Sequence, residues 1–182
     1  MKKKKQFHLQ TSLSYTQQLK FDKQEKAFWV KYFNNPPEPK DIPKYVKHLS
    51  FRSCDITDEE IYFLTRRVEC IDMLDLDDAY ITKDSIKFLT KLKGIQELRL
   101  KGCTELSNDC VVHLKKLNGL HLLHLVGTNI TLEALTGMDN FSNLKKLFIS
   151  TDIKQDITAH MQRLKQELPL CEFYVNYTLY PN

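Results

Sequence analysis

Large apolar residues recur along this chain at nearly constant intervals, and this regularity limits the possible folds more than any other feature. The intervals are 24 to 26 residues, and the marker residues are Leu49, Leu74, Leu98, Leu123, Leu147 and Phe173. A second apolar residue follows each marker two positions later: Phe51, Leu76, Leu100, Leu125, Ile149 and Val175. Alternation with a period of two is typical of a strand. The spacing therefore predicts six strands that stack in parallel, with their inward side chains in register.

A second motif follows each of the first four predicted strands. Its order is apolar, Ser or Thr, any residue, acid, any residue, apolar, and it occurs at residues 56–61, 81–86, 106–111 and 130–135. The hydroxyl can accept a hydrogen bond from a free N–H group at a helix start, and the acid is favoured by the helix dipole there. Each interaction contributes on the order of 0.5 to 1 kcal/mol. The motif predicts four helix starts, at Thr57, Thr82, Ser107 and Thr131.

Together, strand and turn resemble a known repeat. The run Leu98-Arg99-Leu100-Lys101-Gly102-Cys103, continued by Leu106, resembles the leucine-rich repeat L-x-x-L-x-L-x-x-[NC]-x-L in its cysteine-containing form. The resemblance covers about residues 46–176, and the cysteine position is held by Cys54, Ala79, Cys103 and Thr128.

This resemblance implies an α/β fold in the form of a right-handed leucine-rich-repeat solenoid. About six parallel strands would form the concave face, and helices would form the convex face. Within the superfamily, the chain resembles the repeat arrays of F-box proteins and, more loosely, those of the mitochondrial ATP synthase coupling factor B group.

Both ends depart from the repeat, so we expect residues 1–45 to form a Lys-rich tail and an N-terminal helical cap, and residues 46–182 to hold the repeats. In the first part, an aromatic face at helical spacing predicts a helix from about Lys23 to Asn34 that seals the core. The last repeat ends in a closing helix and strand, and the helix is marked by Ile153, Ile157, Met161, Leu164 and Leu168. Three tyrosines near the end are expected to cover the edge of the last strand: Tyr174, Tyr177 and Tyr180.

The composition narrows the class of protein. The net charge is +4, which the run Lys2 to Lys5 supplies by itself, so the basic character belongs to the tail. Nucleic-acid binding through this tail remains a minor alternative. Five cysteines without a C-x-x-C pair indicate reduced thiols. No apolar run approaches the roughly 18 residues of a membrane span. We expect a cytoplasmic protein without a membrane partner.

Enzyme signatures are missing from the sequence, which has no glycine-rich phosphate loop, no G-x-S-x-G and no H-E-x-x-H. His121 and His124 lie three residues apart on a predicted strand and face opposite sides, which argues against a shared metal ion. We therefore expect no catalytic activity, no cofactor and no metal site.

The repeat phase assigns side chains to the predicted concave face and so defines a candidate protein-binding site: Leu122, His124, Val126, Phe148, Tyr174, Met73 and Arg99. Aromatic and aliphatic residues with charges around them are typical of a protein-binding hot spot. In the charged half, we expect Asp75 and Asp77 to pair with Arg52 and with the basic residues of the next strand.

The leading interpretation is a non-catalytic protein-protein interaction module, of the adaptor or effector kind, that binds an unidentified protein on the concave face. Two alternatives concern the patch itself, which a terminal segment could cover or which could mediate self-association. A third alternative is an adaptor or assembly factor that recruits its partner through the N-terminal cap, in an F-box-like or coupling-factor-like role.

Overall fold

The computed structural model describes residues 14–33, 41–117, 119–138 and 141–181. These residues form an α/β fold around a seven-stranded sheet, in which the strands follow one another in chain order. The first six strands are parallel and the seventh is antiparallel to the sixth. The strands are β1 (Tyr45–Ser50), β2 (Cys70–Asp75), β3 (Gly94–Arg99), β4 (Leu122–His124), β5 (Lys146–Ile149), β6 (Glu172–Val175) and β7 (Thr178–Leu179).

The marker residues pair directly across the sheet, as the sequence predicts. Leu49 is the register partner of Leu74, and the succession continues through Leu98, Leu123, Leu147 and Phe173. All of these side chains are buried in one hydrophobic core. Residues at equivalent positions of successive parallel strands are therefore register partners across the sheet.

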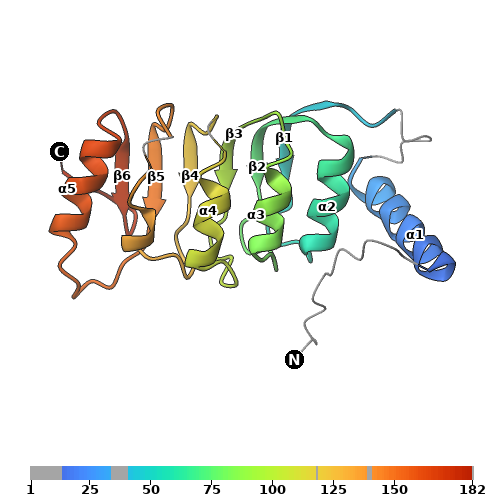
Figure 1. The fold of residues 1–182 in the computed structure, drawn as a ribbon, viewed down its shortest axis with the longest axis horizontal. Coiled ribbons are helices and arrows are strands. Elements are labelled where there is room, and N and C mark those ends of the chain that lie inside the picture. The colour runs from blue at the N-terminus through green and yellow to red at the C-terminus, as the bar shows by residue number, and fades with distance from the viewer. Residues whose placement is uncertain (1–13, 34–40, 118, 139–140, 182) are drawn as a thin grey trace.

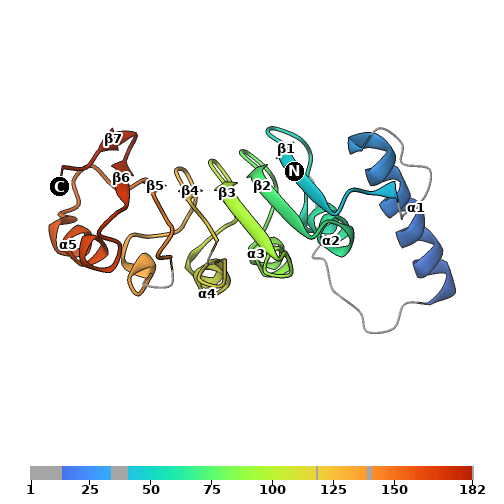
Figure 2. The same cartoon turned by 90° about the horizontal axis from the view of Figure 1, so that it is seen from above.

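Helices lie along one face of the sheet (Figures 1 and 2). Those facing the strands are α2 (Asp58–Arg67), α3 (Lys83–Leu89), α4 (Val111–Leu114) and α5 (Thr158–Glu167). Their inward leucines are fully buried, including Leu64, Leu89 and Leu114. In the described part of the chain, no helix covers the other face of the sheet, which we call the open face.

Two of the four predicted helix starts have the expected cap. The Thr57 hydroxyl accepts a hydrogen bond from the Glu59 N–H group and forms a capping box with Glu60, and the Thr82 hydroxyl accepts from the Asp84 N–H group. These bonds satisfy N–H groups that a helix start would otherwise leave unpaired.

The other two predicted caps are wrong. The Ser107 hydroxyl donates to the Asp109 carboxylate at 2.8 Å and caps no backbone group. At Thr131, the only helical turn nearby is the 3-10 turn Glu133–Leu135, whose N-cap is Leu132. Here the Thr131 N–H group donates to the Asn108 side chain instead. The Thr131 hydroxyl likewise accepts from the Asn108 side-chain amide, at 3.2 Å.

The turns after the first four strands share a left-handed residue at equivalent positions: Ser53, Asp78, Gly102 and Gly127, with φ between 53° and 75°. Only two of the four are glycine, the residue that adopts this conformation without strain. Two contacts show how closely the turns approach. The Cys103 thiol donates to the Leu76 carbonyl at 3.1 Å, and a Cβ atom added to Gly102 would overlap the Asp78 carboxylate.

At the N-terminal end, α1 (Tyr15–Tyr32) packs beside α2 (Figure 1). It begins eight residues earlier than predicted, because Ser14 and Gln17 form a capping box. Phe28 and Trp29 are buried in the core, and the Phe28 ring lies 6.0 Å from that of Phe51. The lysine run and the end of the predicted helix at Asn34 lie outside the described residues.

At the C-terminal end, α5 and β6 form the expected closing helix and strand. Ile153 is not part of this helix and is 92% exposed. The edge of β6 is covered by the backbone of β7, not by tyrosine side chains, which corrects the prediction. Within the described residues, no helix combines the length and the apolar character needed to cross a bilayer.

Candidate protein-binding face

The strand register brings four candidate residues and Asp75 into one line across the open face. Asp75, Arg99, His124, Phe148 and Tyr174 are successive register partners on β2 to β6. Each lies next to a buried marker residue, so its side chain projects from the opposite face of the sheet. The line is polar over β2 and β3 and aromatic over β4, β5 and β6.

Three rings form a contact series that we call the aromatic row: His124, Phe148 and Tyr174. The Phe148 and Tyr174 rings stack with centroids 4.4 Å apart and planes 11° apart. The His124 ring lies 5.0 Å from Phe148 at 58°. All three side chains are half-buried, so the row presents ring surface to solvent. Leu122 and Met73 are also half-buried on this face.

Val126 is the one candidate residue that is not accessible to a partner on the open face. It is buried, with only 8% of its surface exposed. β4 ends at His124, and the chain then turns through Gly127 at a φ of 75°. Leu125 belongs to the hydrophobic core and Val126 does not, so the alternation of faces continues and Val126 lies toward the open face, where neighbouring groups shield it from solvent.

Tyr177 joins the aromatic row although the sequence assigned it to the strand edge. Asn176 and Tyr177 connect β6 to β7, and both have positive φ, 48° and 67°. A two-residue hairpin turn requires this backbone, which is unusual for tyrosine. The Tyr177 ring lies edge-on to His124 at 6.2 Å, and the Lys101 amine lies 5.9 Å from its centroid. Tyr177 is still 56% exposed.

The charged half of the open face is built around Arg52. Its guanidinium pairs with Asp75 at 2.8 Å and with Asp77 at 3.3 Å, which confirms the part of the predicted cross-strand pairing that concerns Arg52. Both acidic residues are nevertheless buried, with 4% of their surface exposed. Asp77 also accepts from the Lys101 N–H group at 2.9 Å. Burial, followed by repulsion from Asp75, raises the pKa of Asp77.

Arg99 and His124 each carry a buried nitrogen without a hydrogen-bond partner among the described residues, Nε of Arg99 and Nε2 of His124. The Arg99 guanidinium contacts Glu97 on its own strand at 3.5 Å, and not Asp75. Burial lowers the pKa of His124, which keeps the imidazole neutral near pH 7. The centre of the open face is therefore polar but incompletely paired.

The described residues contain no cluster of three or more His, Cys, Asp or Glu side chains that could hold a metal ion. Burial raises the pKa of the Cys103, Cys110 and Cys171 thiols to about 12. These thiols stay protonated at neutral pH and are poor nucleophiles. Cys103, the turn cysteine among these three, therefore has a packing role.

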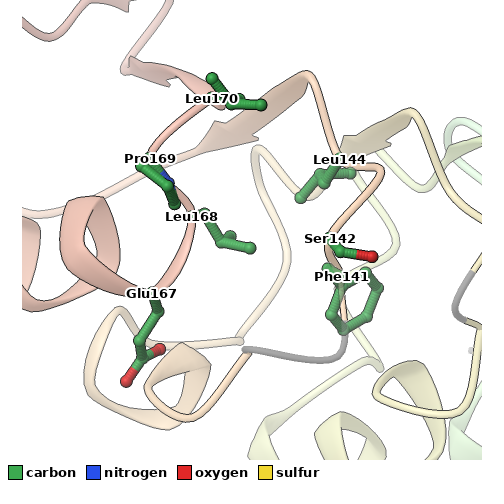
Figure 3. A pocket seen from close by; sticks show the side chains of 7 residues that line it. All are labelled: Phe141, Ser142, Leu144, Glu167, Leu168, Pro169 and Leu170. Atoms are coloured by element: carbon green, nitrogen blue, oxygen red, sulfur yellow. The ribbon is translucent and has the colours of Figure 1, made fainter.

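A small cavity lies between α5 and the segment before β5 (Figure 3). Its volume is about 170 Å³, and it is lined by Phe141, Ser142, Leu144, Glu167, Leu168, Pro169 and Leu170. Sites for small molecules usually measure about 300 to 1,000 Å³. The Glu167 carboxylate already accepts from the N–H groups of Gly137 and Met138. This cavity is a weaker candidate than the open face.

The fold and the site thus define an α/β protein with a mostly parallel sheet and an exposed aromatic row on one sheet face. No protein-family model matches the sequence, and no curated protein matches it.

Proposed function

We propose that this chain is a leucine-rich-repeat solenoid of the cysteine-containing type, with the open face as its concave side. Three observations support the proposal. The marker residues pair at intervals of 24 to 26 residues, all helices facing the sheet lie on one side of it, and the Cys103 thiol bonds under the turn backbone. In such arrays each unit contacts chiefly its neighbours, and the strand face is the usual binding surface.

On this basis the protein acts as a non-catalytic protein-protein interaction module. The observation that carries this function is the half-exposed aromatic row, in which two rings stack and a third lies against them. Aromatic side chains on a rigid sheet provide contact area at little entropic cost, and such residues dominate binding energy at interfaces. All five cysteines are free, which fits the cytoplasmic location that we propose.

The test is partner capture from a lysate with a variant that carries Phe148→Asp and Leu122→Asp. The matched control is Val112→Asp, because Val112 is an exposed apolar residue of α4 on the helix side. Mass spectrometry should identify proteins retained by the wild type and by the control but not by the double variant. Retention of the same partners by all three proteins would reject the open face as the binding site.

A second candidate is recruitment through α1. Tyr15, Leu19 and Val30 are apolar residues of this helix that remain 41% to 80% exposed. Deletion of residues 1–45 is a poor test, because Phe28 and Trp29 belong to the core. A variant with Tyr15→Ser and Leu19→Ser removes the exposed surface and leaves the core intact. If α1 recruits the partner, this variant loses it while Phe148→Asp with Leu122→Asp retains it.

A further inference from the structure

We propose that the occupant of the open face is a peptide segment in which an aromatic or aliphatic side chain lies beside a single carboxylate. The aromatic row contacts the apolar side chain, and the Lys101 amine binds the carboxylate. This inference rests on the proposed function and adds the chemistry of the partner to it.

The pairing of charges on the open face limits the occupant to about one negative charge. Arg52 pairs with Asp75 and Asp77, and Arg99 contacts Glu97. The third pair joins Lys146 to Glu172 at 3.7 Å. Among the described residues, the Lys101 amine has no carboxylate partner, and it lies 5.9 Å from the centroid of the Tyr177 ring. A polyanion such as a nucleic acid would meet four carboxylates on the same face.

The position of Tyr177 ties this free cation to the aromatic row. The Tyr177 ring is close to both the Lys101 amine and the His124 ring, with its centroid 5.9 Å from the amine and 6.2 Å from the His124 centroid. It is held there by a backbone of positive φ. Such strained backbone often occurs at binding sites, where the surrounding structure maintains it. An occupant that touches the row is therefore also next to a positive charge.

The incompletely paired centre favours a peptide over a purely apolar ligand. Arg99 Nε carries a hydrogen and can only donate, and in the described structure it has no acceptor. Backbone carbonyls of an extended peptide are acceptors of the required kind. Because Arg99 Nε is buried, the side chains above it must move for this bond to form, as interface side chains commonly do on binding.

The experiment selects a phage library of random twelve-residue peptides on the full chain and then measures the best peptides by fluorescence anisotropy. We expect the enriched sequences to share one Asp or Glu next to an aromatic or aliphatic residue. Replacing that acid in the peptide by its amide should weaken binding to the wild-type protein about tenfold. The same change should have almost no effect on binding to the Lys101→Met variant, because the cation that pairs with the acid is absent there. Lys116→Met, an exposed lysine of the helix side, serves as the control and should behave as the wild type.

Tyr177→Gly separates a binding role from a structural one. Glycine adopts positive φ freely, so this variant should keep or raise the melting temperature while peptide affinity falls at least fivefold. A purely structural tyrosine would lower both quantities together.

Three outcomes would overturn the inference. The peptides could lack a shared acid, the acid-to-amide change could act equally on the wild type and on Lys101→Met, or a labelled twelve-nucleotide single strand could bind better than any peptide. Peptides that lose binding on Phe148→Asp but not on Lys101→Met would reject the inference and leave the proposed function standing. If no peptide is enriched, the inference fails, and the lysate capture decides the proposed function independently.

Discussion

The carboxylate of Asp58, at the start of α2, accepts hydrogen bonds from both the backbone N–H group and the hydroxyl of Ser85 in α3. The same carboxylate accepts from the N–H group and the hydroxyl of Thr82. One buried side chain thus organises the start of the next helix along the sheet. Asn108 has a smaller version of this role, since it bonds to the N–H group and hydroxyl of Thr131.

Asp58→Ala should therefore be strongly destabilising. The change removes four hydrogen bonds to a charged group and leaves donors of Ser85, which is fully buried, without a partner. A loss of about 3 kcal/mol in the free energy of unfolding is expected, to be measured by urea denaturation. The control is Asn108→Ala, which removes exposed bonds and should cost less than about 1 kcal/mol. Equal losses in the two variants would contradict the account.

The contact between Asp78 and Gly102 gives a second prediction. Gly102→Ala should lower the free energy of unfolding by about 2 kcal/mol or more, because the new Cβ meets the Asp78 carboxylate and φ is +72°. Adding Asp78→Gly should restore part of this loss, since it removes the overlap. By itself, Asp78→Gly should change stability by less than about 1 kcal/mol, because it also relieves a φ of +62°. Additive effects in the double variant would exclude the contact as the cause.

Asp77→Asn predicts a pH dependence of stability. The pKa of Asp77 is raised by burial and by Asp75, so its charged form is less favourable in the folded protein than in the unfolded chain. Asn keeps an oxygen that can accept from the Lys101 N–H group. The variant should thus be more stable than the wild type at pH 7. The difference should shrink as the pH falls through the raised pKa of Asp77 and vanish below its ordinary value of 3.8.

Urea unfolding of both proteins between pH 3 and 7 checks this prediction. The wild-type and variant proteins share the other groups around this site, Arg52, Asp75, Arg99, Lys101 and His124. Their titration therefore largely cancels in the difference between the two proteins. A constant difference across the pH range would show that the charge of Asp77 is not responsible.

Thiol reactivity tests the arrangement of the core. Cys54 and Cys70 are half-buried, whereas the other three cysteines are buried with pKa values raised to about 12. Iodoacetamide at pH 7.5 should modify Cys54 and Cys70 in the native protein, and peptide mass spectrometry should find Cys103, Cys110 and Cys171 unmodified. In 8 M urea all five should react. Rapid native modification of Cys103 would place it outside the core.

The sheet could be predicted closely from the sequence because one kind of information, the interval between large apolar residues, specifies the strands and their register together. Leu98 and Leu123 pair as expected for this reason. Features that depend on how neighbouring groups cover a position were not predictable in the same way. Val126 follows the alternation of faces, yet only 8% of its surface is exposed, because the interval between apolar residues does not specify what covers a side chain.

Two further differences come from local backbone geometry that the sequence pattern does not specify. Ser107 fits the pattern of a helix cap and does precede a helical turn, but this is the 3-10 turn Asn108–Cys110, where the hydroxyl accepts from no backbone N–H group. Tyr177 lies in a turn whose positive φ has no clear signal in a tyrosine. The only signal for a hairpin turn in the sequence is weak: Asn176 comes before Tyr177, and the short strand-forming pair Thr178–Leu179 follows. The binding role of the open face stays a prediction.

The strict succession of strands from β1 to β7 also bears on how the molecule is made. Each parallel strand finds its partner in a segment only 24 to 26 positions earlier in the chain. Closing such short loops costs little entropy, and the cost is nearly equal at every step. A nascent polypeptide leaving the ribosome could therefore add one strand at a time to an edge that is already formed, without waiting for its last residues to be synthesised.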